Sequence, residues 1–286
     1  MLGEIFDETI IFAQLMSYYN HLYIKDVDIN DRCVTDLSEY FYCCESLESI
    51  NASKLDTSQV ENMYSCFNGC KSLKSLDIND WDVSNVNNMN SCFSECMELR
   101  DLDLSRWNTS KVEDISGCFS GCTKLRELDL SLWDTSKVKN MNSCFSGCTE
   151  LRDLDLSNWN TSSVIDMSDC FSKCASLRSL DLSNWNTSNV NTLLRCFSGC
   201  TDLKSLDLSS WDTSKVVNMS SCFAGCTSLI YLDIRDWIIN RDCHIKDIFK
   251  GCKNLSIIRC RQDTFNVLMT ELGDGWVYEY GYAIKY

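Results

Sequence analysis

A repeat of 26 residues is the feature that most constrains how this chain can fold. The dipeptide Cys-Phe recurs at positions 66, 92, 118, 144, 170, 196 and 222, and a second cysteine lies four residues after each first one. Tyr40-Phe41 and Ile248-Phe249 extend the series in both directions, which gives about nine copies. One short unit cannot enclose a core alone, so the units must stack on one another as a solenoid.

Each unit has about nine apolar positions, which are expected to form continuous buried columns. In the unit that begins at Leu99 they are Leu99, Leu102, Leu104, Trp107, Val112, Ile115, Cys118, Phe119 and Cys122. The alternation from Leu102 to Leu104 predicts a short strand. Residues 108–110 (Asn-Thr-Ser) predict a polar turn. The spacing of three and four from Val112 to Phe119 predicts a short helical or 3₁₀ segment.

One further position favours glycine, because the chain must turn there before the next strand. Gly121 occupies it in this unit, whereas Glu95 and Lys173 stand at the same position in two other copies. Glycine is therefore favoured at this turn but not required.

The repeat resembles that of a known family. The pattern LDLSxWDTSxVxxMxxCFxGCxxL, seen at Leu128–Leu151 and Leu206–Leu229, is similar to the 26-residue repeat of BspA-like leucine-rich repeat proteins. The resemblance implies a right-handed solenoid used in adhesion or protein binding, mostly on bacterial or protozoan surfaces and also in large DNA viruses. We therefore expect an α/β to mainly-β repeat solenoid of about nine units. Each unit contributes a short strand and a short helical or 3₁₀ segment, and both ends are capped.

Three segments are predicted from the ends and the repeat: a capping helix over 1–23, the solenoid over 24–260, and a helix–strand cap over 261–286. Apolar residues at helical spacing and an acidic start favour a helix over 3–20; binding of a partner or a membrane surface is the alternative. A degenerate first strand is expected over 24–29. The C-terminal cap should contain a helix over 264–272 and a strand over 276–286.

The charge of the chain limits its partners. It has 26 basic and 41 acidic residues, and the net charge of −15 argues against nucleic acid and anionic membranes. No apolar stretch is long enough to span a membrane. Only two histidines, His21 and His244, are present, and no catalytic set or phosphate-binding loop is recognisable. We therefore expect no enzyme activity, no cofactor and no metal.

Sixteen of the 20 cysteines fall in the two repeat columns. Reduced, buried thiols are the leading interpretation; disulfides between coils and zinc sites remain alternatives. Reduced thiols and the absence of a secretion signal predict a cytoplasmic location, in the host cytoplasm if the chain is viral. A cell-surface location is the alternative.

Outward positions of the strands form the candidate binding face. The Asp column comprises Asp77, Asp103, Asp129, Asp155, Asp181, Asp207 and Asp233. The Lys/Arg column comprises Lys74, Arg100, Arg126, Arg152, Arg178 and Lys204. The two columns could neutralise one another, recognise a basic partner, or hold calcium. A third column, of tryptophans, is predicted to be buried; a strip for binding sugars or bases is the alternative.

The sequence favours a non-enzymatic scaffold for protein–protein interaction that uses this outward face. Another protein is the expected partner, and a basic surface would complement the charge of the chain. A surface adhesin for host protein or glycan and an acidic DNA-mimic inhibitor are the alternatives. The oligomeric state is left open, including an end-to-end dimer.

Overall fold

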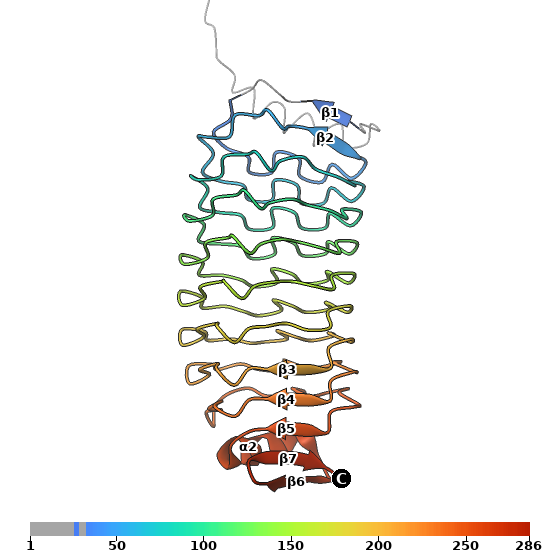
Figure 1. Cartoon of the computed structure of the whole chain (residues 1–286), viewed down its shortest axis with the longest axis vertical. Coiled ribbons are helices and arrows are strands. Elements are labelled where there is room, and N and C mark those ends of the chain that lie inside the picture. Colours follow the sequence, from blue (N-terminus) through green and yellow to red (C-terminus); the bar gives the residue numbers. More distant parts are fainter. Residues whose placement is uncertain (1–25, 29–32) are drawn as a thin grey trace, which may run out of the picture.

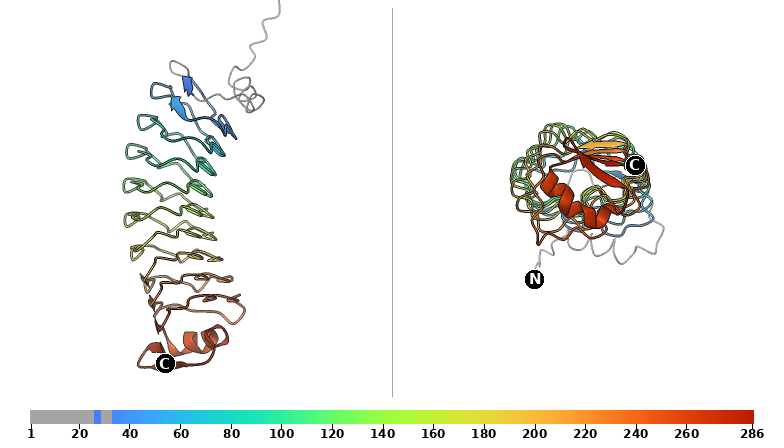
Figure 2. Two further views of the ribbon diagram at one scale, coloured as in Figure 1. Left: turned by 90° about the vertical axis from the view of Figure 1, so that its right-hand side faces the viewer. Right: turned by 90° about the horizontal axis from the view of Figure 1, so that it is seen from below.

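The computed structural model describes residues 26–28 and 33–286, with side chains from residue 33 onward. Its elements are β1 (Asp26–Asp28), β2 (Ser49–Asn51), β3 (Ser205–Asp207), β4 (Tyr231–Asp233), β5 (Ile257–Arg259), α2 (Gln262–Leu272), β6 (Trp276–Glu279) and β7 (Tyr282–Lys285). Figure 1 shows one rod of stacked coils, with β5, α2, β6 and β7 at its C-terminal end. The stack is gently curved (Figure 2).

Equivalent residues of successive coils lie beside one another in parallel. A series of parallel bridges begins with Asn62 and Asn88 and continues at 26-residue intervals to His244. In the C-terminal coils, Leu206 lies opposite Leu232, which lies opposite Ile258. This register confirms the predicted repeat solenoid.

The phenylalanines form one row inside the rod. Rings from Phe41 to Phe249 stack on their neighbours, with centroids 5.2 to 5.8 Å apart and planes within 13° of parallel. Each ring is buried, since Phe93, Phe119 and their equivalents are fully enclosed. The predicted continuous column is therefore confirmed, and it extends the core along the length of the stack.

The strands are short, as predicted, but less continuous than the sequence predicts. In the middle coils the strand positions form only isolated bridges, such as Asp101 with Glu127. The backbone hydrogen bonds next to these bridges are long. For example, the backbone nitrogen of Arg126 lies 3.5 Å from the carbonyl oxygen of Arg100. The corresponding bond from Ile230 to Lys204 is 2.8 Å, next to β3 and β4. Regular strands therefore appear where the coils approach more closely.

The predicted helical or 3₁₀ segment is wrong; the structure has a series of turns instead. Cys92 donates its backbone N–H to Met89 within the coil, at 3.1 Å. The next residue, Phe93, donates to Cys118 of the following coil, at 2.8 Å. Because alternate N–H groups bond to the neighbouring coil, no helix can form, although the apolar residues have helical spacing.

Residues in the left-handed conformation maintain this alternation between hydrogen bonds within a coil and hydrogen bonds to the next coil. Two positions per coil have positive φ, as at Ser91 (56°) and Glu95 (58°). Gly121 occupies the position of Glu95 in the next coil, with a φ of 74°, and Lys173 occupies it further along, with 61°. The preference for glycine at this turn is confirmed, and the residues with side chains adopt the less favourable conformation there.

The polar turn at 108–110 matches its prediction. The Asn108 side chain accepts a hydrogen bond from the N–H of Ser110, at 3.2 Å. The Thr109 hydroxyl donates to the carbonyl oxygen of Asp134 in the next coil, at 3.1 Å. The side chains thus close the turn and also join neighbouring coils.

At the C-terminal end the helix agrees with its prediction, but the following strand does not. Residues 276–286 form a hairpin in which β6 and β7 pair antiparallel, and β7 pairs in turn with β5. The reversal lies at Tyr280 and Gly281, which have φ angles of 51° and 87°. Two consecutive residues of positive φ are typical of a tight hairpin turn, which the single predicted strand did not allow for.

At the N-terminal end, β1 lies within the predicted strand over 24–29 and pairs in parallel with β2. The capping helix predicted over 1–23 lies outside the described residues.

Candidate interaction face

Leucines that alternate with polar residues anchor the candidate face. Leu102 and Leu104 point into the rod and are buried, whereas Asp103 between them is exposed. All members of the Lys/Arg column are exposed, as are the Asp column residues from Asp77 to Asp207. The two columns therefore lie on the surface, at the outward strand positions.

Most of the Asp column residues accept hydrogen bonds from a serine two residues later. Asp103 Oδ1 accepts from the N–H of Ser105 at 3.0 Å and from its hydroxyl at 2.7 Å. The same pair of bonds recurs at Asp129, Asp155 and Asp181. Donation from these serines lowers the pKa of Asp103, Asp155 and Asp181. The serine bonds therefore hold the carboxylates from Asp103 to Asp207 in fixed positions.

The expected neutralisation between the two columns is wrong for the described ion pairs. Lys74 pairs with Glu48 at 2.6 Å, and Arg126 pairs with Glu150 at 2.8 Å. Among the ion pairs of residues 33–286, none joins the Lys/Arg column to the Asp column. The carboxylates from Asp103 to Asp207 accept hydrogen bonds from their own serines, while Lys74 and Arg126 pair with glutamates of neighbouring coils.

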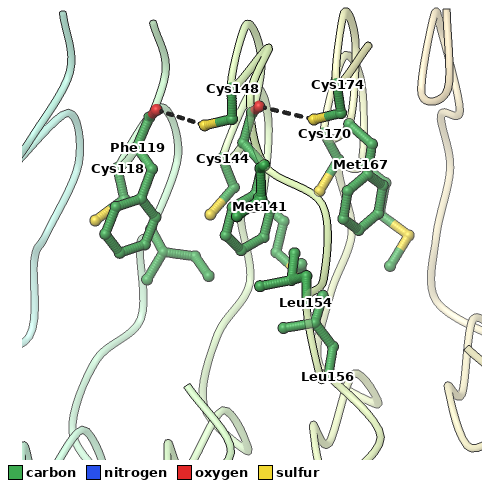
Figure 3. Close-up of a cluster of buried hydrophobic side chains, with 14 of the residues drawn as sticks. Cys118, Phe119, Met141, Cys144, Cys148, Leu154, Leu156, Met167, Cys170 and Cys174 are labelled. Atoms are coloured by element: carbon green, nitrogen blue, oxygen red, sulfur yellow. Dashed lines mark hydrogen bonds between the residues drawn. The ribbon is translucent and has the colours of Figure 1, made fainter. Parts of the chain in front are cut away.

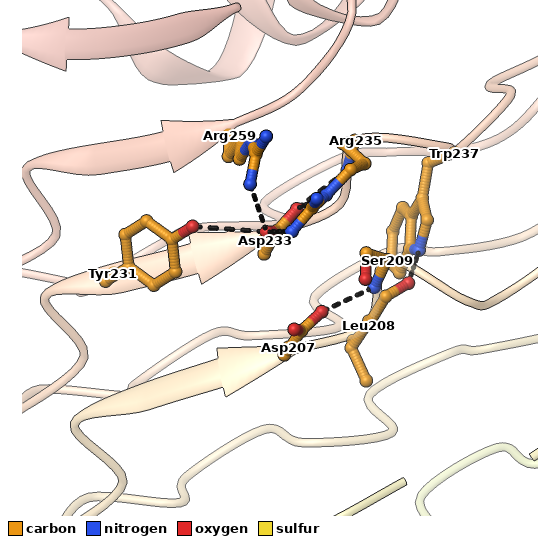
Figure 4. A network of polar contacts seen from close by, with 8 residues as sticks. All are labelled: Asp207, Leu208, Ser209, Tyr231, Asp233, Arg235, Trp237 and Arg259. Atoms are coloured by element: carbon orange, nitrogen blue, oxygen red, sulfur yellow. Dashed lines mark hydrogen bonds and ion pairs between the residues drawn. The ribbon is translucent and has the colours of Figure 1, made fainter. Parts of the chain in front are cut away.

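Asp233 departs from the rest of its column because it is buried, with only 1% of its surface exposed. Arg235 donates from Nε to its Oδ1 at 3.0 Å, and Arg259 Nη1 lies 3.6 Å from its Oδ2. The Tyr231 hydroxyl donates to Oδ2 at 3.1 Å (Figure 4). This carboxylate is saturated by the protein itself, so the exposed column ends at Asp207.

Sequence reasoning did not identify this cluster. The sequence does contain a signal for it, because Tyr231 and Arg235 stand at the repeat positions that Ser205 and Ser209 occupy one coil earlier. Arg259 also lies over the ring of Tyr282, 5.5 Å from its centroid.

Inside the rod, thiols bond to the main chain. Cys148 Sγ donates to the carbonyl oxygen of Phe119 at 3.1 Å, and Cys174 does the same to Phe145 (Figure 3). Both cysteine columns carry free thiols, and all their members are buried except Cys252, which is half-buried. Burial raises the pKa of Cys118 and Cys122 well above its usual range. The column thiols are thus neutral core groups with partners of their own.

The tryptophans are buried, as predicted. Trp107 and Trp185 are each 2% exposed, and their indole N–H groups donate to Ile78 and Leu156 carbonyl oxygens. Because these rings are enclosed and hydrogen-bonded, they do not form an accessible strip for sugars or bases.

Other possible sites offer little chemistry. Within the described part of the chain, no group of three or more His, Cys, Asp or Glu residues is placed to hold a metal ion. A pocket of about 200 Å³ lies between the last coil and the cap, lined in part by Cys252, Glu271 and Trp276. This pocket is smaller than the roughly 300–1,000 Å³ usual for small molecules. A second pocket, of about 380 Å³ and lined in part by Ile239, Thr264 and Val267, lies at the lower end of that range.

A family model described as "Mycoplasma protein of unknown function, DUF285" matches residues 35–154 and 145–259. These two stretches together cover most of the chain. The chain belongs to the DUF285 family. Among curated proteins, none matches the sequence at a significant level.

Solved structures with some similarity are distant from this DUF285 protein. A leucine rich cell surface protein from Faecalibacterium prausnitzii has 19% identity and a TM-score of 0.36, covering 90% of this chain and 85% of that one. A chain of an octameric complex of Latrophilin 3, Unc5D and FLRT2 (LRR) has 14% identity and a TM-score of 0.33, covering 88% of this chain and 82% of that one. A TLR13–ssRNA13 complex has 18% identity and a TM-score of 0.34, covering 84% of this chain and 44% of that one.

The DUF285 match coincides with the stacked coils. It begins at residue 35 and ends at residue 259, before α2 starts at Gln262. The candidate columns therefore lie within the part of the chain that the family shares. In the described residues, no helix has the length and apolar character needed to cross a bilayer.

Proposed function

We propose that this DUF285 protein is a non-enzymatic scaffold that binds another protein through the outward face of its strand positions. The observation that carries the proposal is the row of exposed carboxylates from Asp77 to Asp207, repeated once per coil. The serine bonds at Asp103 and its equivalents fix these groups before a partner arrives, which lowers the entropic cost of binding.

The partner fits best if its surface is basic. The chain has a net charge of −15, and charges repeated along a rod attract a complementary surface and orient its approach. The Lys/Arg column, part of which is held by Glu48 and Glu150, would contribute to the register of binding.

The finer features of the proposal follow the same reasoning. We propose a BspA-like leucine-rich repeat type with about nine coils and right-handed winding. We also propose a cytoplasmic location, since the buried thiols that bond to Phe119 and Phe145 would persist in a reducing compartment.

The test removes charge without disturbing the turns. In D103N/D129N/D155N, asparagine still accepts the serine bonds through Oδ1, as Asn108 does from Ser110. We expect this variant to lose at least about tenfold in affinity for the partner recovered by cross-linking and affinity purification. Loss of binding at high salt is expected as well.

A matched control is present on another line of the rod. Asp82, Asp134 and Asp212 are also exposed and accept from a serine two residues later. The D82N/D134N/D212N variant removes the same charge from another line of the rod and should bind as the wild type does. Recovery of no specific protein, or equal loss in both variants, would contradict the proposal.

A further inference from the structure

The candidate face changes from charged to apolar near its C-terminal end. Ile230 takes the next position of the Lys/Arg column, after Lys204, and is 47% exposed. Tyr231 and Ile257 follow Ser205 in the neighbouring column, as the parallel register of β3, β4 and β5 shows. Polar positions of the upstream coils are thus replaced by large apolar side chains.

The register extends this change across the whole sheet. Ile257 lies opposite Ile284 of β7, which lies opposite Val277 of β6. Their neighbours Leu232, Ile258 and Ala283 are buried in the core, so these residues point outward. We call the outward residues the sheet patch: Ile230, Tyr231, Ile257, Val277 and Ile284.

The patch is not covered by the C-terminal helix. α2 packs on the other side of the sheet, where the ring of Phe265 lies 5.4 Å from that of Tyr278. Figure 1 shows α2 behind β7, with the strands in front of it. Val277 accordingly remains 42% exposed. Tyr231, Ile257 and Ile284, which lie between Ile230 and Val277, are half-buried. A partly exposed apolar surface of this kind is typical of an interaction site.

The charges beside the patch determine what fits it. The nearby guanidiniums of Arg235 and Arg259 are engaged by Asp233. In the adjacent outward row, Asp207 and Glu279 lie at the two ends and are exposed. The Asp column continues from Asp207 along the rod. The exposed carboxylates of Asp207 and Glu279 therefore flank the patch, and Lys204 lies beside Ile230 in the preceding coil. Cationic groups of a partner would complement the carboxylates and the Asp column beyond them.

We propose that the sheet patch docks an extended segment of a partner protein in which apolar side chains are followed by lysine or arginine. The apolar side chains lie on the patch, and the basic ones lie along the Asp column. This inference rests on the proposed scaffold function and specifies the partner's chemistry and where it binds.

The test uses a synthetic peptide as the probe. Its first half alternates isoleucine and serine, and its second half alternates lysine and serine. Binding of the labelled peptide to the full chain is measured by fluorescence anisotropy. We expect at least about tenfold weaker binding when the isoleucines are replaced by serine or the lysines by glutamate. Equal binding of all three peptides, or binding of none, would overturn the inference.

Variants of the chain locate the contact. I230S/V277S should weaken binding of the peptide by at least about tenfold, because it removes the two most exposed apolar side chains of the patch. I165S/V217S is the matched control, since Ile165 and Val217 are 45% and 59% exposed elsewhere on the rod. The control should bind within about twofold of the wild type. Equal effects of the two variants would overturn the inference.

Two outcomes separate this inference from the scaffold function and from self-association. A partner protein that is lost with D103N/D129N/D155N but kept with I230S/V277S would overturn the patch while the scaffold stands. Sedimentation of the chain alone should show no association that depends on Ile230 and Val277. If it does, a second copy occupies the patch and the inference is wrong.

Discussion

The thiol of Cys122 donates a hydrogen bond to the carbonyl oxygen of Phe93, 29 residues earlier, at 3.1 Å. The same bond recurs one coil further on, from Cys148 to Phe119. A column of cysteines therefore acts as a column of hydrogen-bond donors inside the core. Each of these carbonyl oxygens also accepts the backbone N–H of the cysteine three residues later, so the thiol supplies its second hydrogen bond.

The stability of the chain should fall at alkaline pH because of the thiols buried in both cysteine columns. Burial raises the pKa of Cys92, Cys118 and Cys144, so their contribution is complete below the unfolded-state pKa of about 8.5 and is lost as the pH rises above it. Each thiol costs about 1.4 kcal/mol of unfolding free energy per pH unit in that range. Urea unfolding measured from neutral pH upward should show a steep loss.

A variant with fewer buried thiols provides the control for the pH effect. C118A/C144A/C170A is less stable at neutral pH, since each substitution leaves a small void. Its stability should nevertheless depend less steeply on pH above about 8.5, because three titrating groups are gone. Parallel curves for this variant and the wild type would count against the thiols as the cause.

Alkylation should distinguish column cysteines from surface ones. Cys33 is exposed, and Cys43 and the last column cysteine, Cys252, are half-buried, whereas the other column thiols are enclosed in the core. Iodoacetamide should therefore modify Cys33 rapidly in the native chain and the enclosed column thiols only after unfolding. Mass spectrometry of tryptic peptides measures this site by site. Rapid native modification of Cys118 or Cys144 would show that the core is open.

Glycine exchanges at the left-handed turn should have opposite effects. Glu95 has a φ of 58°, so E95G should stabilise the chain by about 1 kcal/mol. Gly147 occupies the same position two coils later, and G147A should destabilise it by about 1–2 kcal/mol. A methyl group there would make only ordinary contacts, at 3.5 Å from Gly121, so the cost is conformational. Thermal unfolding of the two variants gives the comparison; shifts of the same sign would contradict it.

Loss of the buried carboxylate should affect the C-terminal coils. D233N leaves Arg235 and Arg259 without their counter-ion, and we expect a loss of about 2–3 kcal/mol in unfolding free energy. D207N, one coil earlier, should cost less than about 0.5 kcal/mol, since its side chain is exposed and asparagine still accepts from Ser209. Chemical denaturation measures the unfolding free energy of both variants. Equal losses in D233N and D207N would contradict this prediction.

The repeat made the core predictable, because Phe67, Phe93 and Phe119 can form one row only if coils of equal length stack. The exposed Asp positions followed from the alternation of leucine and aspartate. The turn around Phe93 was not predictable from spacing, since Val112, Ile115 and Phe119 would have the same intervals in a helix. Which N–H bonds to which coil depends on the left-handed residues, and Ser91 does not signal this conformation.

The burial of Asp233 could not be predicted from the other residues of its column either. Its burial depends on Arg259, 26 residues later, and on Tyr231 and Arg235, whose contacts arise only once the coils are stacked. The sheet patch could not be predicted from the sequence for the same reason. Val277 joins Ile257 and Ile284 only because the chain reverses at Gly281, which the single predicted strand did not include.

The alternate bonding of turn residues to the following coil, seen at Phe93 and Cys118, has a consequence for how such a chain can change in length. Every interior coil donates these bonds to the coil after it and accepts the equivalent bonds from the coil before it. Duplication or loss of one whole unit by recombination would rejoin matching surfaces, whereas a change of any other length would misalign them. The length of the rod can thus change by one coil at a time, while the residues at its two ends stay the same.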